Sequence, residues 1–410
     1  MAADIIIVGG GIMGLCTAWQ IRRRSDVKIL VLEKGRGLGE GSTGASSAVC
    51  RHRYTLSEMV ELARDGINAY RDWPAFTGLL HPRAQFHQDG VLWINDRGRT
   101  WAEQERDRMR HLEIGAEVLS SQDVRDRFPA ISTCLTPPDL IEGTPHQCRE
   151  EGDFLFESTG GYFEPVDALN DLAEVLSAHD VAIRFNSRVR SIRTAGGIAT
   201  GVELESGEQL DTGTIINTTG PWCNELLEPL GLTGRWPLKP TRIQVLHVDR
   251  PSFVPGRIPV CCDLVGGIYF REQNRGQQIV IGSAMEEDER EVVDPSDHAT
   301  WVDNDFVAAK MHALVHRLPT LPSTSRATGY VGLYTVNQDD VHPIVGRTEI
   351  GNFLVANGFS GHGFKIGPAI GSLLAQAVTG ERRDYDTDVS AEFLAIDRES
   401  LEVDARNVMA

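Results

Sequence analysis

The sequence predicts an α/β fold made of two interleaved domains, one of them Rossmann-like. Three observations support this prediction. A strand, a glycine-rich turn, a helix and a second strand follow one another in residues 4–34, and glycine-rich segments return at 216–222 and 358–365. Two stretches of mixed helix and strand pattern lie between these segments, and 410 residues are enough for two domains.

The first strand is the apolar run Ile5–Val8, which has the composition of a buried parallel strand. Gly9, Gly11 and Gly14 follow it as a G-x-G-x-x-G motif ahead of a helix that we expect to reach Arg24. The first glycine permits a tight turn, the second lets backbone N–H groups approach a pyrophosphate, and the third lets helix and strand pack closely. The N-terminus of the helix attracts the anion.

The second strand, Ile29–Leu32, ends in Glu33, roughly 20 residues after the third glycine. A carboxylate at this place accepts hydrogen bonds from a ribose 2′-hydroxyl and disfavours a 2′-phosphate. The pattern therefore predicts a bound dinucleotide, and by itself it does not separate FAD from NAD.

The later helices and strands are predicted from the spacing of apolar residues and from the glycine and proline residues that mark turns. We expect helices at 60–73, 101–111, 167–178 (with Asp167 as the N-cap) and from 365 to 379. We expect strands at 90–94, 181–185, 187–193, 201–204, 214–217, 243–248, 267–270 and 278–282. Residues 1–80, 150–230 and 325–410 are assigned to the nucleotide-binding domain, and 81–149 and 231–324 to the second domain.

The composition excludes several classes of function. A net charge of −18 argues against nucleic-acid binding and against simple attraction to anionic lipid. The basic run at 22–24 is read as the solvated end of the first helix, and the acidic run at 286–291 as a solvated loop. No apolar run is long enough to span a membrane. The seven cysteines are odd in number and lack metal-like spacing, so we expect a reduced, cytoplasmic protein without a metal site.

Four further segments carry a resemblance to a known family: 41–47, 216–222, 334–347 and 358–365. With them the chain resembles, over nearly its whole length, the D-amino-acid oxidase superfamily of FAD enzymes. The sarcosine oxidase, glycine oxidase and dimethylglycine dehydrogenase branch is the most similar. The resemblance implies FAD rather than NAD, bound by the Rossmann-like domain. It also implies that the interleaved domain is an α+β substrate domain on a mostly antiparallel sheet.

The resemblance extends the cofactor site beyond the first unit. It implies that the loop 42–49 passes over the pyrophosphate and flavin, that Val189 lies near the adenine, and that the turn 358–365 faces the flavin pyrimidine. The expected cofactor-binding residues are Gly9, Gly11, Ile12, Met13, Gly14, Glu33, Lys34, Gly41, Ser42, Thr43, Ser46, Ser47, Ala48, Val49, Val189, Thr219, Gly220, Trp222, Gly332, Leu333, Gly358, Phe359, Ser360, Gly361, His362, Gly363, Phe364 and Lys365.

The resemblance also implies a carboxylate-binding pair. Arg51 matches the arginine of the family pattern Arg-His-x-Tyr, and Lys365 closes Gly-Phe-Ser-Gly-His-Gly-Phe-Lys. An arginine fork recognises a carboxylate at two points, and a lysine adds a point charge. Arg53 would replace Arg51 if the register slipped by two.

Two more residues complete the catalytic set. Tyr269 (or its neighbour Phe270) falls near the family's substrate-facing tyrosine. His52 lies close to the cofactor segments, where a structural hydrogen-bonding role is weighed against proton transfer.

The chain departs from the family at positions that affect its chemistry. Gly332 stands where monomeric sarcosine oxidase has its flavin-linking cysteine, and Gly44 interrupts the motif that precedes the linking histidine of the dimethylglycine dehydrogenase branch. We therefore expect non-covalent FAD, with His52 as the remaining alternative. Val280 stands where the family has an oxygen-activating lysine, which predicts slow reaction with oxygen. Ala284 stands at the position of an active-site histidine, so the substrate pocket is altered.

These features predict an FAD-dependent oxidoreductase that oxidises the C–N bond of an amino acid or N-alkyl amino acid. Hydride would pass to flavin N5, and water would hydrolyse the resulting imine. The expected partners are a small amine carrying a carboxylate and an electron acceptor, which could be oxygen, a quinone or an electron-transfer protein. Three alternatives stay open: oxidation of a 2-hydroxy acid, which needs a nearby base, a flavoprotein subunit of an electron-transfer complex, and a non-catalytic dinucleotide-binding module.

Overall fold

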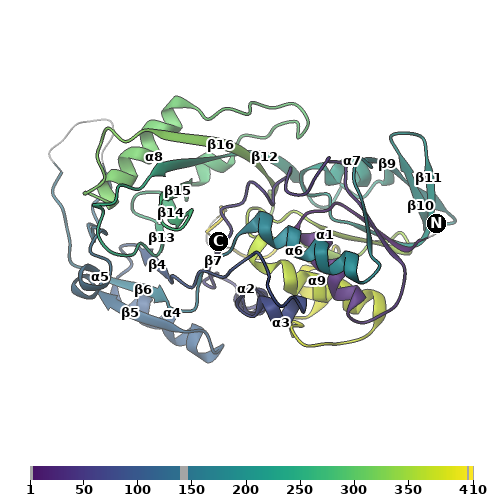
Figure 1. Ribbon diagram of the computed structural model, residues 1–410, viewed down its shortest axis with the longest axis horizontal. Helices are drawn as coiled ribbons and strands as arrows, with labels where there is room; N and C mark the ends of the chain where they lie inside the picture. The colour runs from purple at the N-terminus through teal and green to yellow at the C-terminus, as the bar shows by residue number, and fades with distance from the viewer. Residues whose placement is uncertain (1–2, 139–145, 404–405, 410) are drawn as a thin grey trace.

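The computed structural model describes residues 3–138, 146–403 and 406–409. Two eight-stranded sheets and a two-stranded ribbon organise these residues (Figure 1). The first sheet runs in the order β17-β18-β11-β1-β2-β8, and β10 and β9 extend it from β11. Its strands are β1 (Ala3–Val8), β2 (Ile29–Leu32), β8 (Ala182–Arg184), β9 (Val189–Ala195), β10 (Ile198–Leu204), β11 (Gln209–Asn217), β17 (Ile344–Arg347) and β18 (Phe353–Asn357).

The centre of the first sheet is parallel, as the apolar runs predict. β1 pairs in parallel with β2 and β11, and β11 pairs in parallel with β18. The side chains of Ile5, Ile6 and Ile7 are buried, because strands covered on both faces leave no side for water. The predicted Rossmann-like unit is confirmed, and β2 has the predicted bounds.

Helices cover this sheet. They are α1 (Ile12–Arg22), α2 (Ser57–Arg71), α3 (Trp73–Thr77), α6 (Pro165–Ala178), α7 (Cys223–Leu227) and α9 (Gly363–Thr379), with 3-10 turns at Gly220–Trp222, Glu228–Leu230 and Ala391–Leu394. The prediction of Asp167 as an N-cap is wrong, because α6 begins at Pro165 and Glu164 takes the N-cap position. The fixed φ of proline suits the first helical position, so Asp167 falls within the first turn.

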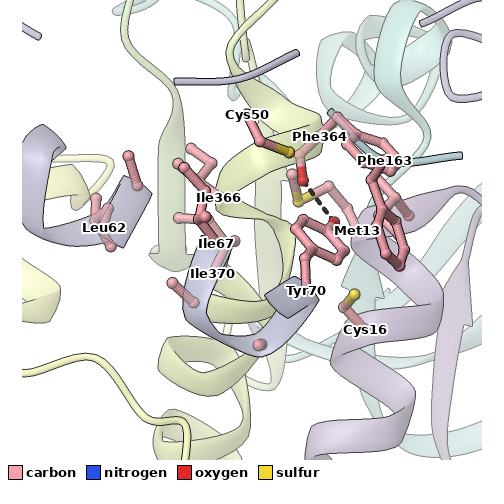
Figure 2. Packing of buried hydrophobic residues seen from close by; sticks show 14 of the residues in the cluster. Met13, Cys16, Cys50, Leu62, Ile67, Tyr70, Phe163, Phe364, Ile366 and Ile370 are labelled. Atoms are coloured by element: carbon pink, nitrogen blue, oxygen red, sulfur yellow. Dashed lines mark hydrogen bonds between the residues drawn. The ribbon is translucent and has the colours of Figure 1, made fainter. Parts of the chain in front are cut away.

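Three of these helices meet at the start of α9 (Figure 2). The Tyr70 hydroxyl of α2 donates to the Phe364 carbonyl at 2.7 Å, and the two rings stack with centroids 5.2 Å apart. A Cβ on Gly66 would lie 2.2 Å from the Lys365 carbonyl oxygen, so α2 approaches α9 more closely than any larger residue allows. Met13 and Cys16 of α1 belong to the same buried cluster.

The second sheet runs in the order β16-β12-β15-β14-β13-β4-β6-β5. Its strands are β4 (Val91–Ile94), β5 (Ala116–Ser120), β6 (Asp153–Glu157), β12 (Leu238–Asp249), β13 (Val260–Asp263), β14 (Ile268–Gln273), β15 (Gln278–Ser283) and β16 (Ala327–Asn337). Neighbouring strands are antiparallel apart from β13 with β4, which confirms a mostly antiparallel sheet. The elements α4 (Gly98–His111), α5 (Ser121–Arg127), α8 (Asn304–Arg317) and a 3-10 turn at Glu286–Glu289 accompany it.

The sheets do not divide where the sequence analysis placed the domain boundaries. β6 and β16 lie beyond the boundaries at 150 and 325, yet both pair within the second sheet. Pairing with strands that are distant in the sequence assigns β6 and β16 to the second sheet, and no local sequence pattern indicates this pairing. The ribbon of β3 (Val49–Cys50) and β7 (Gly161–Tyr162) forms a separate two-stranded pair. Within the described ranges, no helix combines the length and the apolar character needed to cross a membrane.

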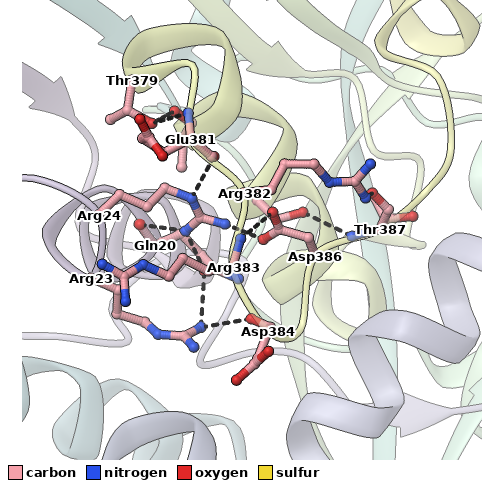
Figure 3. A network of polar contacts seen from close by, with 12 residues as sticks. Gln20, Arg23, Arg24, Thr379, Glu381, Arg382, Arg383, Asp384, Asp386 and Thr387 are labelled. Atoms are coloured by element: carbon pink, nitrogen blue, oxygen red, sulfur yellow. Dashed lines mark hydrogen bonds and ion pairs between the residues drawn. The ribbon is translucent and has the colours of Figure 1, made fainter.

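The basic run at the end of α1 is only partly solvated, because Arg22 and Arg23 are partly exposed but Arg24 is buried. Arg24 forms an ion pair with Asp386 in which the two side chains are 0% and 4% exposed. Its guanidinium also donates to the Gln20 side chain at 2.8 Å and to the Glu381 carbonyl at 3.1 Å (Figure 3). The segment after α9 folds back over α1, so solvent is excluded from this part of the basic run.

Replacing Asp386 with asparagine should destabilise the fold by about 3–5 kcal/mol, because the buried Arg24 charge loses its partner. Asp388→Asn is the matched control: Asp388 pairs with Arg382, but the two side chains are 78% and 59% exposed, so little change is expected. Urea unfolding followed by circular dichroism measures both. Equal midpoints for the two variants would contradict the importance of the buried pair.

Candidate active site

A cleft of about 260 Å³ opens where the carboxyl ends of β1 and β2 meet the starts of α1 and α9. This is the place at which open α/β sheets bind ligands. Val8 and Leu32 line the cleft as the last residues of their strands. Loop residues 39–46 and 218–222 complete the walls, together with 333–335 and 359–361.

The glycine turn shapes one wall of the cleft. Gly9 has a φ of +111°, and a Cβ on Gly14 would lie 1.9 Å from the Gly9 carbonyl oxygen. Glycine at position 14 therefore lets α1 begin directly against the end of β1. The Ile12 amide donates to the Thr43 hydroxyl at 3.1 Å, and Gly11 offers no side chain to cap the helix. The start of α1 thus presents N–H groups and a positive dipole end to the cleft.

The acidic residue after β2 is held rigidly at the cleft. Glu33 accepts the Gly10 amide at 2.8 Å and the Gly35 amide at 2.7 Å. Nearby, the Lys34 ammonium lies 3.2 Å from the centre of the Trp222 ring, and both residues line the cleft. The backbone hydrogen bonds orient the Glu33 carboxylate, and each of its oxygens retains a lone pair for a ribose hydroxyl.

Most of the predicted cofactor residues line this cleft: Gly9, Gly11, Ile12, Met13, Glu33, Lys34, Gly41, Ser42, Thr43, Ser46, Val189, Thr219, Gly220, Trp222, Leu333, Phe359, Ser360, Gly361, Gly363 and Phe364. Ser47, Val49 and Lys365 line a second cavity instead. In the part of the chain that the structure describes, Gly14, Ala48, Gly332, Gly358 and His362 line neither.

Several lining residues were not predicted: Val8, Gly10, Leu32, Gly35, Gly39, Glu40, Ser187, Arg188, Thr218, Pro221, Glu225, Leu226, Tyr334 and Thr335. Many of them adjoin a predicted residue, so a wider window around each motif would have found them. Arg188 and Glu225 form an ion pair at 2.7 Å, which only the fold brings together.

The cleft fits a dinucleotide. It offers a carboxylate for ribose and a helix N-terminus for pyrophosphate. The Ser42 hydroxyl is buried and has no hydrogen-bond partner among the described residues. Since buried polar groups are normally satisfied, this hydroxyl points to a ligand.

A smaller cavity of about 30 Å³ adjoins the cleft. Ser46, Tyr334, Gly361 and Phe364 line both spaces. The small cavity brings together three of the predicted catalytic residues, Arg51, Lys365 and Tyr269, and Val408 and Met409 close one side of it.

Arg51 and Lys365 are two buried cations, 2% and 4% exposed. In the described residues neither forms an ion pair with a carboxylate. Burial and the neighbouring Arg51 lower the pKa of Lys365 to about 7. Arg51 donates to the carbonyl oxygens of Arg53 and Val408. Buried charge without a partner is costly, so this pair is suited to an anionic ligand.

The structure separates Arg51 from Arg53 and His52. Arg53 lies 3.5 Å from Glu105, and its side chain does not reach the described lining of the small cavity. The His52 Nδ1 lies 3.0 Å from the buried Glu157 carboxylate. Glu157 also accepts the His52 amide at 2.6 Å and the Trp93 indole N–H at 2.7 Å. The geometry therefore places Arg51, and not Arg53, at the small cavity. His52 is held by Glu157 instead.

Glu157 was not predicted, and no local signal marks it. Burial raises its pKa, but the hydrogen bonds from His52 and Trp93 outweigh burial and lower it. An ionised carboxylate thus holds the backbone of residues 52–53 in place behind Arg51.

Glu289 was read as part of a solvated acidic loop, and this prediction is wrong. Its carboxyl is buried and accepts the Val408 amide at 3.0 Å. Burial raises its pKa to about 8, so it is largely protonated at neutral pH.

The substrate-side strands place two more residues. The Ser47 hydroxyl donates to the Tyr269 hydroxyl at 3.2 Å, whereas Phe270 belongs to the core on the other face of the sheet. Tyr269, not Phe270, faces the small cavity. Arg271 pairs in register with Val280 and donates to the Ser47 carbonyl at 2.7 Å. A buried cation therefore lies one strand away from Val280.

Comparison with known proteins identifies the family of this chain. The family described as DAO, FAD dependent oxidoreductase, matches residues 4–377. FAD-dependent oxidoreductase domain-containing protein 1 of Xenopus laevis is 26% identical over 413 residues, covering 92% of this chain and 79% of that protein. Peroxisomal sarcosine oxidase of Mus musculus is 25% identical over 398 residues, covering 93% and 94%. The crystal structure of L-proline dehydrogenase from P. horikoshii shares the fold, with a TM-score of 0.81 at 19% identity over 96% of this chain and 97% of that one.

Gly14→Ala should abolish retention of FAD, because the added methyl group would collide with the Gly9 carbonyl and displace the start of α1. Gly213→Ala is the control, since a Cβ there would lie 3.4 Å from its nearest neighbour, an ordinary contact. The ratio of flavin to protein absorbance after gel filtration measures retention. A normal ratio in Gly14→Ala would show that the close approach is dispensable.

Proposed function

The chain belongs to the DAO family of FAD-dependent oxidoreductases, and we therefore propose that it oxidises a carbon–nitrogen bond in a small amino acid or N-alkyl amino acid. The observation that carries this proposal is the pair of buried cations, Arg51 and Lys365, in a cavity that adjoins the dinucleotide cleft. Two relatives reported above are named for acting on sarcosine and L-proline, which are both N-alkyl amino acids.

The cleft residues would hold FAD, with Glu33 on the ribose and the start of α1 on the pyrophosphate. Gly332 has no side chain for a thioether, which supports non-covalent binding. Bound FAD would supply the two-electron acceptor for hydride from the carbon that bears nitrogen.

The protein's own groups position the substrate. The Arg51 guanidinium recognises the carboxylate at two points, and the Lys365 ammonium adds charge at a third. Tyr269 faces the same space and offers a hydroxyl to a substrate polar atom. An amine that binds unprotonated needs no side-chain base, so these residues chiefly orient the reacting carbon and exclude water.

Our proposal for the electron acceptor rests on Val280, which stands where the family resemblance expects a lysine. This side chain is buried and apolar where the family carries a lysine, so no flexible ammonium assists oxygen reduction from β15. Arg271 on the next strand is committed to the Ser47 carbonyl. We propose slow reaction with oxygen and delivery of electrons to a quinone or an electron-transfer protein.

The first experiment mixes the FAD-loaded enzyme anaerobically with matched compounds and follows the flavin absorbance. Sarcosine, L-proline and both alanine enantiomers are compared with dimethylamine and pyrrolidine, which lack the carboxylate, and with lactate, which replaces nitrogen by oxygen. We expect bleaching by at least one amino acid, none by its decarboxylated analogue, and slow recovery in air. Bleaching by lactate alone would overturn the amine assignment.

Arg51→Lys should weaken the affinity for the reducing amino acid on the order of 100-fold, because one ammonium cannot reproduce the two-point contact. Arg53→Lys is the matched control, since it keeps a cation opposite Glu105. The concentration dependence of the bleaching rate yields both affinities. A larger loss in Arg53→Lys would transfer the carboxylate site to Arg53.

Carboxylate binding should weaken as pH rises above about 7, because the free enzyme loses the Lys365 proton there. Below that pH the lysine is already charged and affinity is constant; above it, Kd increases by up to tenfold per pH unit. Anthranilate is a suitable probe, because it carries an amine and a carboxylate but no hydrogen on the carbon that bears nitrogen. Its Kd is measured from changes in the flavin spectrum.

Two variants separate the ionising groups in this titration. Lys365→Met should bind anthranilate weakly and lose the pH dependence between 7 and 8. Glu289→Gln should keep the Lys365 effect and remove only the additional weakening above pH 8, where the Glu289 carboxyl would otherwise ionise and repel the ligand. An unchanged slope in Lys365→Met would exclude Lys365 from carboxylate binding.

A further inference from the structure

A cluster of sulfur and imidazole ligands lies apart from the flavin site, beside the second sheet. Cys134, His146 and His316 each offer one ligand atom, and these atoms all lie within 4.8 Å of one another. The Cys134 Sγ is 3.2 Å from the His146 Nε2, and the two imidazole rings have centroids 4.7 Å apart. The Thr136 hydroxyl donates to the Gln147 carbonyl at 2.8 Å, which places Cys148 on a segment beside Cys134, so that a second sulfur lies near the three clustered ligand atoms.

We propose that Cys134, His146, Cys148 and His316 form a structural zinc site. Two thiolates and two imidazoles are a ligand set that zinc binds tetrahedrally. Sulfur and nitrogen ligands at ~2.3 and ~2.1 Å from one ion stand roughly 3.6 Å apart. The measured 3.2 Å between Cys134 and His146 is close to that spacing, so small movements would complete the geometry. The two thiols give up their protons to solvent on binding, and the site becomes electrically neutral.

The His316 side chain supports a ligand here. Its Nε2 is buried and has no hydrogen-bond partner in the described parts of the chain. Because buried polar atoms are normally satisfied, an orphaned imidazole nitrogen on a residue that shares a cluster with Cys134 and His146 indicates a missing partner. A metal ion would satisfy it.

Contacts from α8 and from the segment around Arg149 position the ligand residues next to Cys134. Arg317, which follows His316 in α8, forms a fully buried ion pair with Asp263 at 2.8 Å and donates to the Cys134 carbonyl at 3.0 Å. The Leu135 amide donates to the Arg149 carbonyl at 2.8 Å, which brings the segment containing Cys148 across to Cys134. These contacts hold the ligands together independently of the ion.

The Cys134 sulfur is also placed as zinc thiolates commonly are. The Thr136 amide lies 3.4 Å from it in hydrogen-bonding geometry. Outer hydrogen bonds of this kind orient metal ligands. The cysteine spacing alone indicates no metal site, because half of the ligands are histidines and His316 is remote in sequence.

The test measures metal in protein purified without a histidine tag and without chelators. Inductively coupled plasma mass spectrometry should find about one zinc per chain. Cys134→Ser and His316→Gln should reduce this by at least half, whereas His312→Gln, one turn earlier and exposed on the same helix, should retain it. Circular dichroism and flavin content confirm that each variant is folded.

Cobalt provides a second measurement on the same proteins. After zinc removal and reduction, Co²⁺ should produce the visible bands of a tetrahedral ion and a thiolate charge-transfer band that Cys148→Ser diminishes. The proposal is overturned by no metal uptake after incubation with Zn²⁺ or Co²⁺, by equal zinc content in all variants, or by a stable Cys134–Cys148 disulfide whose reduction restores no metal binding.

Discussion

The close packing of α1, α2 and α9 is the constraint on which the site depends. The start of α1 forms one wall of the dinucleotide cleft, and the start of α9 carries Lys365 into the adjoining cavity. α2 holds the start of α9, because Gly66 lies against the Lys365 carbonyl and Tyr70 bonds to the Phe364 carbonyl. α9 in turn packs directly on α1, since a Cβ on Gly371 would lie 2.9 Å from the Cys16 carbonyl carbon. Backbone contacts of this kind leave little freedom, since interiors are close-packed and transmit small shifts. The cofactor cleft and the proposed carboxylate site are therefore built on one closely packed group of helices.

Local sequence patterns predicted those parts of the site that are formed by residues close together in the chain. β1, the glycine turn, α1, β2 and Glu33 follow one another within 34 residues, and each has its own composition signal. The end of α9 at Thr379 and most of the cleft-lining residues of the later motifs were also predicted. Long-range pairing was not predictable in this way. β6 and β16 were not among the predicted strands, and only hydrogen-bonding partners more than 30 residues away assign them to the second sheet.

Two site residues that the sequence analysis did not predict, Glu157 and Glu289, also depend on contacts between distant parts of the chain. Glu157 is one acid among many in the sequence and becomes a buried anchor only because β6 passes beneath residues 52–53. Glu289 sits in a run of charges, and the segment 406–409 covers it. The same chemical group thus has its pKa lowered at one position and raised at the other. Donated hydrogen bonds decide the first, and desolvation decides the second. A sequence lists the carboxylates but does not report their surroundings.

The hydrogen bond from Arg51 to the Val408 carbonyl affects how the affinity for a carboxylate ligand is interpreted. The Arg51 guanidinium already has an acceptor in the Val408 carbonyl, and the space around it holds about 30 Å³, enough for one or two water molecules rather than an amino acid. On the proposed mode of binding, a carboxylate at Arg51 would compete with that carbonyl and move Val408 and Met409 aside. An observed dissociation constant is therefore the balance of two competing occupants, and changes in residues 406–409 can alter it without touching a substrate atom.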